Sequence, residues 1–251
     1  MRAALTLAER ELVRFFRQPN RVLGALLQPL IFWLLFGAAF RGSFRAPMAG
    51  QTYQQFFLPG IVVLIALFTA IFSTISIIED RREGFLQAVL VAPVRRSSMV
   101  LGKVMGGTLL AVLQGTLFLL LGPLAGVSLT LSGVLGSAGV LFAVGFALTS
   151  LGFCIAWRMD SIQGFHAIMS VFLMPLWLLS GAFFPADGLP AWLAWVIRLN
   201  PLTYGVESLR IALALAPGPA GWPLAVTALF GLALFGLACL LARRRTRVDL
   251  R

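Results

Sequence analysis

Apolar runs separated by short polar breaks make up most of the chain. Six of them are long enough to approach or exceed the roughly 20 residues that a helix needs to cross a bilayer. They cover about residues 22–40, 56–78, 98–121, 132–157, 162–184 and 222–241. The third and fourth belong to one uncharged stretch, 104–157, which must fold back near Gly122-Pro123 because a single helix would be about 80 Å long. The pattern predicts an all-α polytopic membrane protein with six transmembrane helices in a single domain, 1–251.

Residues 3–18 precede the first run and show helical periodicity with two unlike faces. One predicted face is apolar and carries Leu5, Ala8, Leu12, Phe15 and Phe16. The opposite face carries Arg10, Arg14 and Arg17. Because such a helix is too charged to cross a bilayer, we expect an interfacial amphipathic helix that Pro19-Asn20 ends. A soluble flanking helix is the alternative.

The stretch 185–221, before the last run, contains two further helix signals. The first is Asp187-Gly188-Leu189-Pro190, after which apolar residues recur at helical spacing as far as Leu199. The second is Asn200-Pro201, with Asn as the cap and Pro at the first helical position, and Pro217-Gly218-Pro219 is the expected end. Tryptophans in this stretch suit a membrane interface. We expect two short re-entrant helices on the outer side.

Composition and charge support a membrane protein. Hydrophobic residues make up 59% of the chain and charged residues 12%, against about 25% charged in soluble domains, and the mean hydropathy is +0.94. The net charge of +11 comes from basic residues at the ends of apolar runs, which is the positive-inside pattern and not a nucleic-acid-binding groove. When the ends of successive apolar runs are assigned alternately to the two sides of the membrane, one side receives only four basic residues, Arg41, Arg45, Arg198 and Arg210. We therefore expect a cytoplasmic-membrane protein with both termini and the charged segment 79–97 in the cytoplasm.

Patterns typical of catalysis are missing from the sequence. There is no Gly-x-x-x-x-Gly-Lys-Ser/Thr loop to hold ATP phosphates, and no His/Glu pair has metal-ligand spacing. Cys154 and Cys239 fall inside apolar runs and are read as small buried hydrophobes. His166, the single histidine, is read as a packed or snorkelling side chain. We expect a chain that is not an enzyme and binds no cofactor or metal of its own.

Ionisable residues are also scarce inside the six runs, whereas ion-driven carriers place such groups at mid-membrane depth. Glu207 and Arg210 lie three residues apart on the second short outer helix, where a local surface ion pair is the simplest expectation. An outer gate is the alternative, and its candidate residues are Asn200, Pro201, Tyr204, Glu207 and Arg210.

The charged segment 79–97 interrupts the apolar pattern. Each charge at the centre of a bilayer costs roughly 2.5–3.5 kcal/mol on insertion scales, so we expect this segment to lie in water at one membrane face. Its second half is amphipathic: Phe85, Leu86, Val89 and Leu90 share one helical face. Pro93 is the expected stop of that helix. A short helix with an apolar face and a charged rim suits the groove of a partner domain, although a plain basic loop that fixes topology is the alternative.

Two motifs in the chain carry a family resemblance. The sequence Glu-Asp-Arg-Arg-Glu-Gly-Phe-Leu-Gln-Ala-Val-Leu-Val-Ala-Pro-Val (79–94) resembles the coupling-helix loop of type-2 ATP-binding-cassette (ABC) exporter permeases. The sequence Asn-Pro-Leu-Thr-Tyr-Gly-Val-Glu-Ser-Leu-Arg (200–210) is similar to the signature that precedes the last span in the same family. The amphipathic start resembles that family's connecting helix. Phe85 and Gln87 depart from the family pattern, which has Thr and Glu there.

The resemblance implies a function and a set of site residues. Energy would come from a separate cytoplasmic ABC ATPase that binds ATP and Mg²⁺, and a second permease copy, identical or paralogous, would complete the complex. The cargo would be a drug, lipid or lipid-linked glycan moved outward across the membrane. The implied ATPase-coupling residues are Glu79, Glu83, Gly84, Phe85, Leu86, Leu90, Ala92 and Pro93.

Two other function classes stay open at this point. A membrane scaffold or assembly factor would keep the spans and would not need an ATPase. An ion-coupled carrier would show transport that survives ATP depletion and collapses with the proton gradient.

Overall fold

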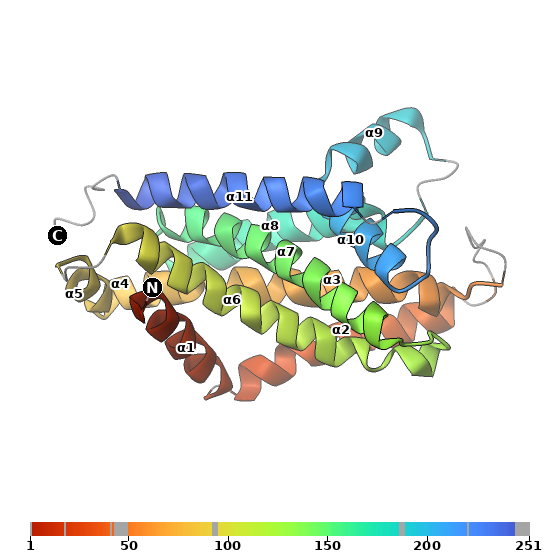
Figure 1. Ribbon diagram of the computed structural model, residues 1–251, viewed down its shortest axis with the longest axis horizontal. Coiled ribbons are helices and arrows are strands. Elements are labelled where there is room, and N and C mark those ends of the chain that lie inside the picture. The colour runs from red at the N-terminus through yellow and green to blue at the C-terminus, as the bar shows by residue number, and fades with distance from the viewer. Residues whose placement is uncertain are drawn as a thin grey trace.

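The computed structural model of the chain describes residues 2–17, 19–40, 42, 50–91, 95–185, 189–219 and 221–243. These residues form helices joined by short turns, and no strand occurs among them (Figure 1). In chain order the elements are α1 (Arg2–Phe16), α2 (Pro19–Ala39), α3 (Tyr53–Ser73), α4 (Ile75–Arg82), α5 (Phe85–Val91), α6 (Arg96–Leu119), η1 (Gly122–Ala125), α7 (Leu131–Ala156), α8 (Ile162–Trp177), η2 (Leu178–Ala182), α9 (Ala191–Leu199), α10 (Pro201–Ala212) and α11 (Gly221–Arg243). The predicted all-α class is confirmed.

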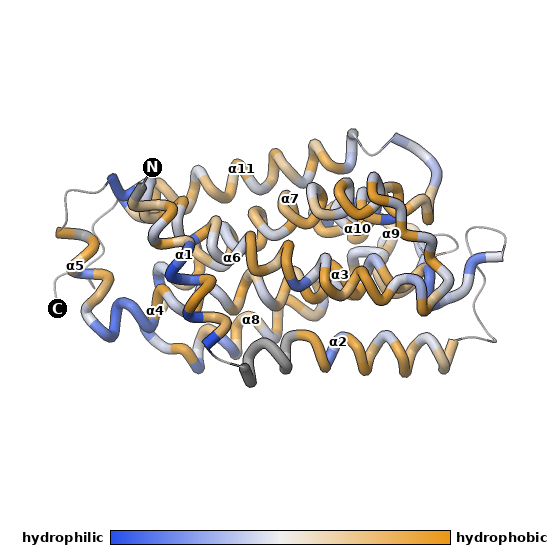
Figure 2. Tube along the Cα trace, turned by 60° about the horizontal axis from the view of Figure 1, so that its bottom comes forward, coloured by the Kyte–Doolittle hydropathy of each residue, from blue (hydrophilic) through white to orange (hydrophobic). Residues whose placement is uncertain are grey.

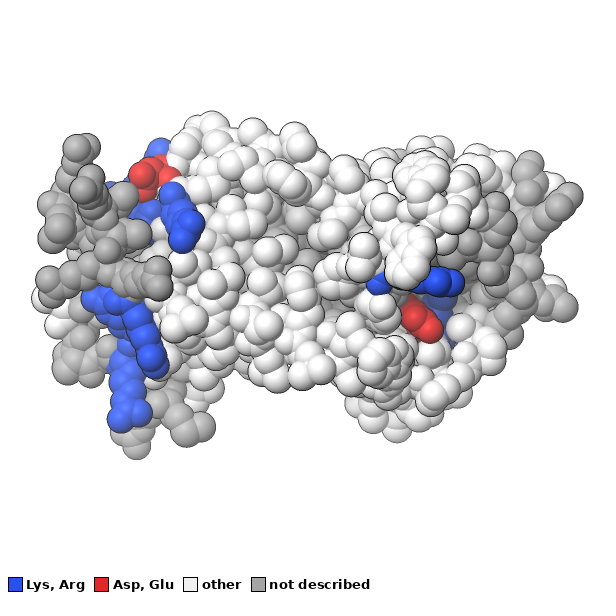
Figure 3. Space-filling model, turned by 90° about the horizontal axis from the view of Figure 1, so that it is seen from above, with Lys and Arg blue, Asp and Glu red and all other residues white. Residues whose placement is uncertain are grey.

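Helix length and apolarity fit a protein that spans a membrane several times. Within the described ranges, the helices long and apolar enough to cross are Tyr53–Arg82, Arg96–Leu119, Leu131–Ala156, Ile162–Ala182 and Gly221–Arg243. The apolar part of α2, Leu26–Ala39, is shorter, so its crossing stays a prediction. Figure 3 shows the same organisation on one face of the molecule, where charged side chains gather near the two ends and the middle is uncharged.

The centre of the bundle is α3. Its residues are buried without interruption from Phe57 to Leu67. A helix that is hydrophobic all round is expected in the interior, because it has no face to give to water. Around α3 pack α2, α6, α7 and α10, while α11 packs on the other side of α7. The long uncharged run 56–78 thus contributes the central helix of the bundle, against which the other helices pack.

Several charged elements gather at one end of the bundle. The start of α1, the whole of α5 and the end of α11 lie toward that end, and α9 and α10 lie toward the opposite one (Figure 1). We call these the proximal and distal ends. Hydrophilic residues are concentrated on α1 and α4 at the proximal end, next to the largely hydrophobic α5 (Figure 2). This arrangement puts the charged segment, the start of α1 and the end of α11 on one side, as expected; which membrane face that is stays a prediction.

The N-terminal helix has the expected length and a different packing face. The face that packs on α6 carries the buried side chains of Ala4, Leu7, Ala8 and Glu11, and Phe15 is buried near the end of the helix. Leu5 and Phe16, which the sequence placed on the apolar face toward the membrane, are 69% and 55% exposed. The helix therefore has a packing face, an exposed apolar face and a charged face. The contact with α6 was not predicted, and the closest approach is at small residues, the glycines of α6.

The distal stretch 189–219 forms the two short helices that were expected. α9 begins after Pro190, while Asp187 and Gly188 lie outside the described residues. The Asn200 side chain caps α10 by accepting from the Leu202 backbone N–H at 3.0 Å, and Pro201 takes the first helical position. α10 ends at Ala212, five residues before the Pro217 at which the sequence predicted its end.

Candidate functional site at the proximal end

The charged segment is built as two short helices joined by a glycine. The helix that contains α3 continues past a break at Thr74 into α4, so residues 79–82 belong to a helix that the sequence had ended at Ile78. Gly84 then turns the chain into α5 with φ of +75°, a left-handed conformation that favours glycine. The segment is therefore an extension of the central helix followed by a sharp turn.

Asp80 on α4 is fully buried, which corrects the expectation that the whole charged segment lies in water. Its carboxylate accepts hydrogen bonds from Arg10 at 2.8 and 3.0 Å, from Arg14 at 3.1 Å and from Lys103. Lys103, 6% exposed, also pairs with Glu11, which is 5% exposed. A buried charge is tolerated where it is paired and hydrogen-bonded. This network joins α1, α4 and α6.

Two glycines of α6 make the network possible. A Cβ on Gly102 would lie 2.8 Å from the Ala4 carbonyl oxygen, and one on Gly106 would lie 2.7 Å from the Glu11 Cβ. Both distances are too short for real contacts, so only glycine lets α1 approach α6 this closely. The close approach carries Glu11 to the ammonium group of Lys103.

Arg81, the residue after Asp80, makes its contacts on another part of the bundle. Its guanidinium donates to the backbone carbonyls of Trp157 at 2.6 Å and Met159 at 3.0 Å, and to the Asp160 carboxylate at 3.0 Å. These acceptors lie where α7 ends and the chain turns toward α8. Carbonyls at a helix end lack partners within the helix, and a cation there is favourable. Arg81 thus ties α4 to the turn between α7 and α8.

The apolar face of α5 turns toward its own chain. Leu86 is 4% exposed and belongs to the core, and Phe85 and Val89 pack against it. This corrects the prediction that these side chains form a free apolar surface for a partner. The outward side of α5 carries Gln87, Ala88 and Val91, and Val91 is 84% exposed.

The remaining coupling candidates fall into two groups. Glu79 pairs with Arg14 at 2.9 Å and is partly buried, while Glu83 lies 3.7 Å from Arg14 and its side chain is 60% exposed. The side chain of Leu90, and Ala92 and Pro93 altogether, lie outside the described residues. The predicted stop at Pro93 therefore stays a prediction.

The candidate gate residues lie at the distal end, where α10 meets the end of α8. The Asn200 amide donates to the Leu176 carbonyl, and Arg210 donates to the Gly181 carbonyl at 2.8 Å. The Arg210 guanidinium also lies 4.1 Å from the centroid of the Phe56 ring. Among the described residues no ion pair joins Glu207 to Arg210, so that simple expectation was wrong.

The other two gate candidates do not meet the end of α8. The Tyr204 hydroxyl donates to the Arg198 carbonyl on α9, and Pro201 is the first residue of α10. Asn200 and Arg210 therefore anchor α10, whereas Glu207 is exposed.

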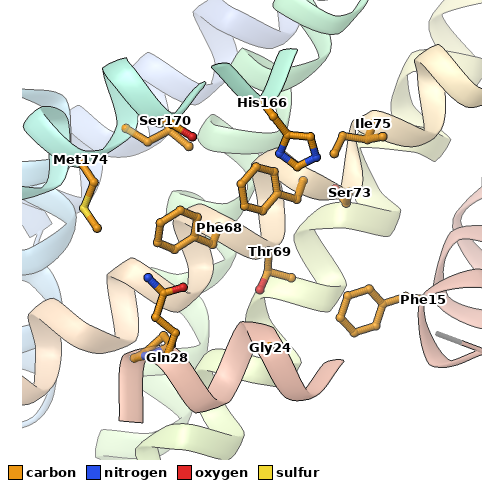
Figure 4. A pocket seen from close by; sticks show the side chains of 13 residues that line it. Phe15, Gly24, Gln28, Phe68, Thr69, Ser73, Ile75, His166, Ser170 and Met174 are labelled. Carbon is orange, nitrogen blue, oxygen red and sulfur yellow. The ribbon is translucent and has the colours of Figure 1, made fainter. Parts of the chain in front are cut away.

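A cavity of about 620 Å³ lies between α1, α2, α3, α4 and α8 (Figure 4). Its apolar lining includes aromatic rings from α1 and α3. The polar lining residues, of which none is a carboxylate, are Gln28, Thr69, Ser73, His166 and Ser170. The ring of His166 lies 5.0 Å from that of Phe72, so the single histidine packs against the wall as expected. Such a lining accommodates an apolar body with a few hydrogen-bonding groups.

The sequence did not single out Asp80, Lys103 or Glu11, although weak signals were present. A lysine at the start of an apolar run and a glutamate among small residues of an amphipathic helix are both unusual. Their partners lie about 20 to 90 residues away, so their meeting could not be read from local spacing. The described residues contain no group of three His, Cys, Asp or Glu side chains that could hold a metal ion.

Comparison with known proteins gives a consistent set of similarities. The model of the ABC-2 type transporter family matches residues 2–214. A putative transport permease ycf38 from Cyanophora paradoxa is 32% identical over 207 residues, covering 81% of this chain and 71% of that protein. Nodulation protein J from Sinorhizobium fredii is 30% identical over 230 residues, covering 89% and 86%. The daunorubicin resistance ABC transporter permease protein DrrB1 from Streptomyces coeruleorubidus is 27% identical over 214 residues, covering 83% and 74%.

Proposed function

The chain belongs to the ABC-2 type transporter family, and from that membership we propose that it is the permease subunit of an ATP-driven exporter. In this proposal a separate ABC ATPase binds ATP with Mg²⁺ and supplies the energy, and two permease copies form the path. The substrate is a hydrophobic or amphiphilic molecule that leaves the cytoplasm. The chain itself is a transport subunit and not an enzyme.

The exposed side of α5 is the observation that carries the proposal. A helix of seven residues lies at the proximal end, fixed to the body by Leu86 through its inner face. Its outer side leaves Gln87, Ala88 and Val91 free for a partner, next to the exposed carboxylate of Glu83. A small apolar and polar surface on a fixed helix suits a shallow groove in another protein. We assign the ATPase contact to this outer side.

The cavity supports an amphiphilic substrate. Aromatic and aliphatic walls favour an apolar body, and neutral polar groups can bind hydroxyl, carbonyl or amide groups. The names of the relatives include resistance to daunorubicin and nodulation, and these properties belong to those proteins.

We further propose that α10 works as the outer gate. Asn200 fastens it to the end of α8 and Arg210 fastens it to η2, which continues α8, so a displacement of α8 would reach the distal end through these contacts. The same helix begins at Pro201, contacts α9 through Tyr204, and presents Glu207 on its exposed face.

The test compares two exposed apolar residues from opposite ends of the bundle. Val91→Asp changes the outer side of α5, and Leu124→Asp changes a residue of η1 that is 78% exposed. The variants are expressed with the ABC ATPase, purified, and reconstituted in proteoliposomes loaded with a fluorescent amphiphile. We expect Val91→Asp to lose ATPase co-purification and ATP-dependent transport, and Leu124→Asp to keep both.

Three outcomes would overturn the proposal. Normal ATPase binding by Val91→Asp would show that the ATPase does not contact the outer side of α5. Transport that persists without ATP and stops when the proton gradient is dissipated would indicate an ion-coupled carrier. A wild-type complex that binds the ATPase and moves no amphiphile in either direction would indicate a scaffold.

A further inference from the structure

The helix α4 is bounded by a break on one side and a glycine turn on the other. At Thr74 the hydroxyl donates to the Ile71 carbonyl at 2.6 Å, and the helix is interrupted between α3 and α4. At its other end, Gly84 with positive φ leads directly into α5. α4 is therefore a short helical segment between a tightened turn at Thr74 and the left-handed turn at Gly84. A displacement of α5 reaches the bundle through α4 as well as through the contact of Phe85 with Arg10.

Two neighbouring residues of α4 divide their contacts between different parts of the bundle. Asp80 binds α1 and α6 through three cations, of which Lys103 is buried while Arg10 and Arg14 are partly exposed. Arg81 binds the end of α7 and the turn that leads into α8. The first group of partners packs tightly, since α1 and α6 meet at two glycines. The partners of Arg81 lead into α8, which has fewer contacts with the rest of the bundle.

The helix α8 is held in the bundle by few elements. Apart from its continuation into η2, its main contacts are with α4 and α3. Only a narrow stripe of it is buried, at Phe165, Met169, Leu173 and Trp177, and the remainder is partly or largely exposed. α8 also supplies His166, Ser170, Leu173 and Met174 to the cavity lining. A shift of its proximal end would therefore change the shape of the cavity.

We propose that α4 is a lever in which Asp80 is the fulcrum and Arg81 is the positioning residue that passes movement of α5 to α8. The inference rests on the proposed function, because it assumes that a partner displaces α5. The ion network holds the α1 and α6 side still. When α4 moves, Arg81 displaces the turn before α8, and the part of the cavity wall that α8 forms is displaced with that turn.

Arg82 is the matched control. It lies beside Arg81 and has the same charge, yet it is exposed and donates one hydrogen bond, to the Asp160 carbonyl at 3.1 Å. Arg81 has an 11% exposed side chain and reaches three acceptors in the same turn. Replacing either by Gln removes one positive charge from the same stretch of helix. Arg81→Gln removes three hydrogen bonds to this turn, whereas Arg82→Gln removes one, so the two variants differ in how strongly they loosen the connection to α8.

The experiment uses the permease–ATPase complex in proteoliposomes. We measure ATP hydrolysis, amphiphile transport, and the distance between spin labels at Ile168 on α8 and Leu240 on α11, with and without trapped nucleotide; both sites are exposed. Arg81→Gln is expected to keep ATPase binding and hydrolysis, to lose at least tenfold in transport per ATP, and to lose the nucleotide-dependent change in distance. Arg82→Gln is expected to stay within twofold of wild type in all three.

A second measurement needs no change at Arg81. With labels at Arg82 and Ile168, the distance from α4 to α8 should stay constant on nucleotide trapping, while the distance from Ile168 to Leu240 changes. The lever is wrong if the first distance changes as much as the second, or if Arg81→Gln transports as well per ATP as wild type. A wild-type complex that shows no ATP-dependent transport would instead overturn the proposed function, so the two failures are distinguishable.

Discussion

The guanidinium of Arg10 lies 3.9 Å from the centroid of the Phe85 ring while it donates two hydrogen bonds to Asp80. One side chain of α1 therefore touches both α4 and the first residue of α5. The hydrogen bond to Asp80 raises the pKa of the Arg10 guanidinium, and partial burial opposes that effect. Arg10 consequently stays charged and keeps α5 attached to the N-terminal helix.

The first prediction concerns this attachment. Replacing Phe85 by Leu removes the cation–π contact and keeps an apolar side chain, so we expect a loss of about 0.5–2 kcal/mol of stability, localised at α5. Proteolysis or hydrogen exchange of residues 84–91 should then increase while the rest of the bundle is unchanged. In a double-mutant cycle with Arg10→Gln, the two losses should not add. Fully additive losses would show that the two side chains do not interact.

The second prediction concerns the buried ion network. Among the described residues, Lys103→Met leaves Glu11 with Arg10 as its one cation, at 3.5 Å, and removes one of the three cations around Asp80. Removing one partner of a buried pair costs about 3–5 kcal/mol, so a clear fall in melting temperature is expected in detergent or lipid nanodiscs. Combining Lys103→Met with Glu11→Leu removes both members of one buried pair and should recover part of the loss. A double variant less stable than Lys103→Met would contradict the pairing.

The spans were predictable because a bilayer leaves the backbone few choices. A long apolar run must form a helix to satisfy its own N–H and C=O groups, so the runs that became α3 with α4, α6, α7, α8 with η2, and α11 were found to within about four residues at each end. The side-chain contacts at the proximal end were not predictable in this way. Asp80 was read as a solvated charge because its partners on α1 and α6 are distant in the sequence.

The orientation of α1 shows why patterns alone fall short. Its apolar periodicity indicated a face toward the membrane and gave no sign of the contact with α6, which is set by Ala4 and Ala8 against Gly102 and Gly106. A periodicity argument depends on the hydrophobicity of the residues, whereas close packing of two helices depends on the size of their side chains. The same limit applies to α5, where apolar spacing marked Phe85 and Leu86 correctly as one face and could not say that the face is covered by the chain itself.

The third prediction separates anchoring from docking on α5. Leu86→Asp puts a charge where the side chain is 4% exposed, so it should lower the stability of the permease or release α5 from the body. Gln87→Arg changes the outer side and should leave stability unchanged while it weakens ATPase binding. Thermal unfolding and ATPase co-purification are measured for both variants. If Leu86→Asp is as stable as wild type and loses only the ATPase, Leu86 would belong to the contact surface after all.

The fourth prediction places the substrate in the cavity. Ser170 and Val171 are neighbours on α8, but Ser170 lines the cavity and Val171 is 69% exposed without lining it. Ser170→Phe adds a ring to the cavity between α2, α3 and α8, where a bound amphiphile would need that volume. We expect it to lower transport at least fivefold and to raise the substrate concentration for half-maximal ATPase stimulation, with basal hydrolysis unchanged.

Val171→Phe adds the same ring to the exposed surface and should behave like wild type. Equal effects of the two variants would show that added bulk on α8 acts through the helix and not through the cavity, and the substrate would then have to bind elsewhere.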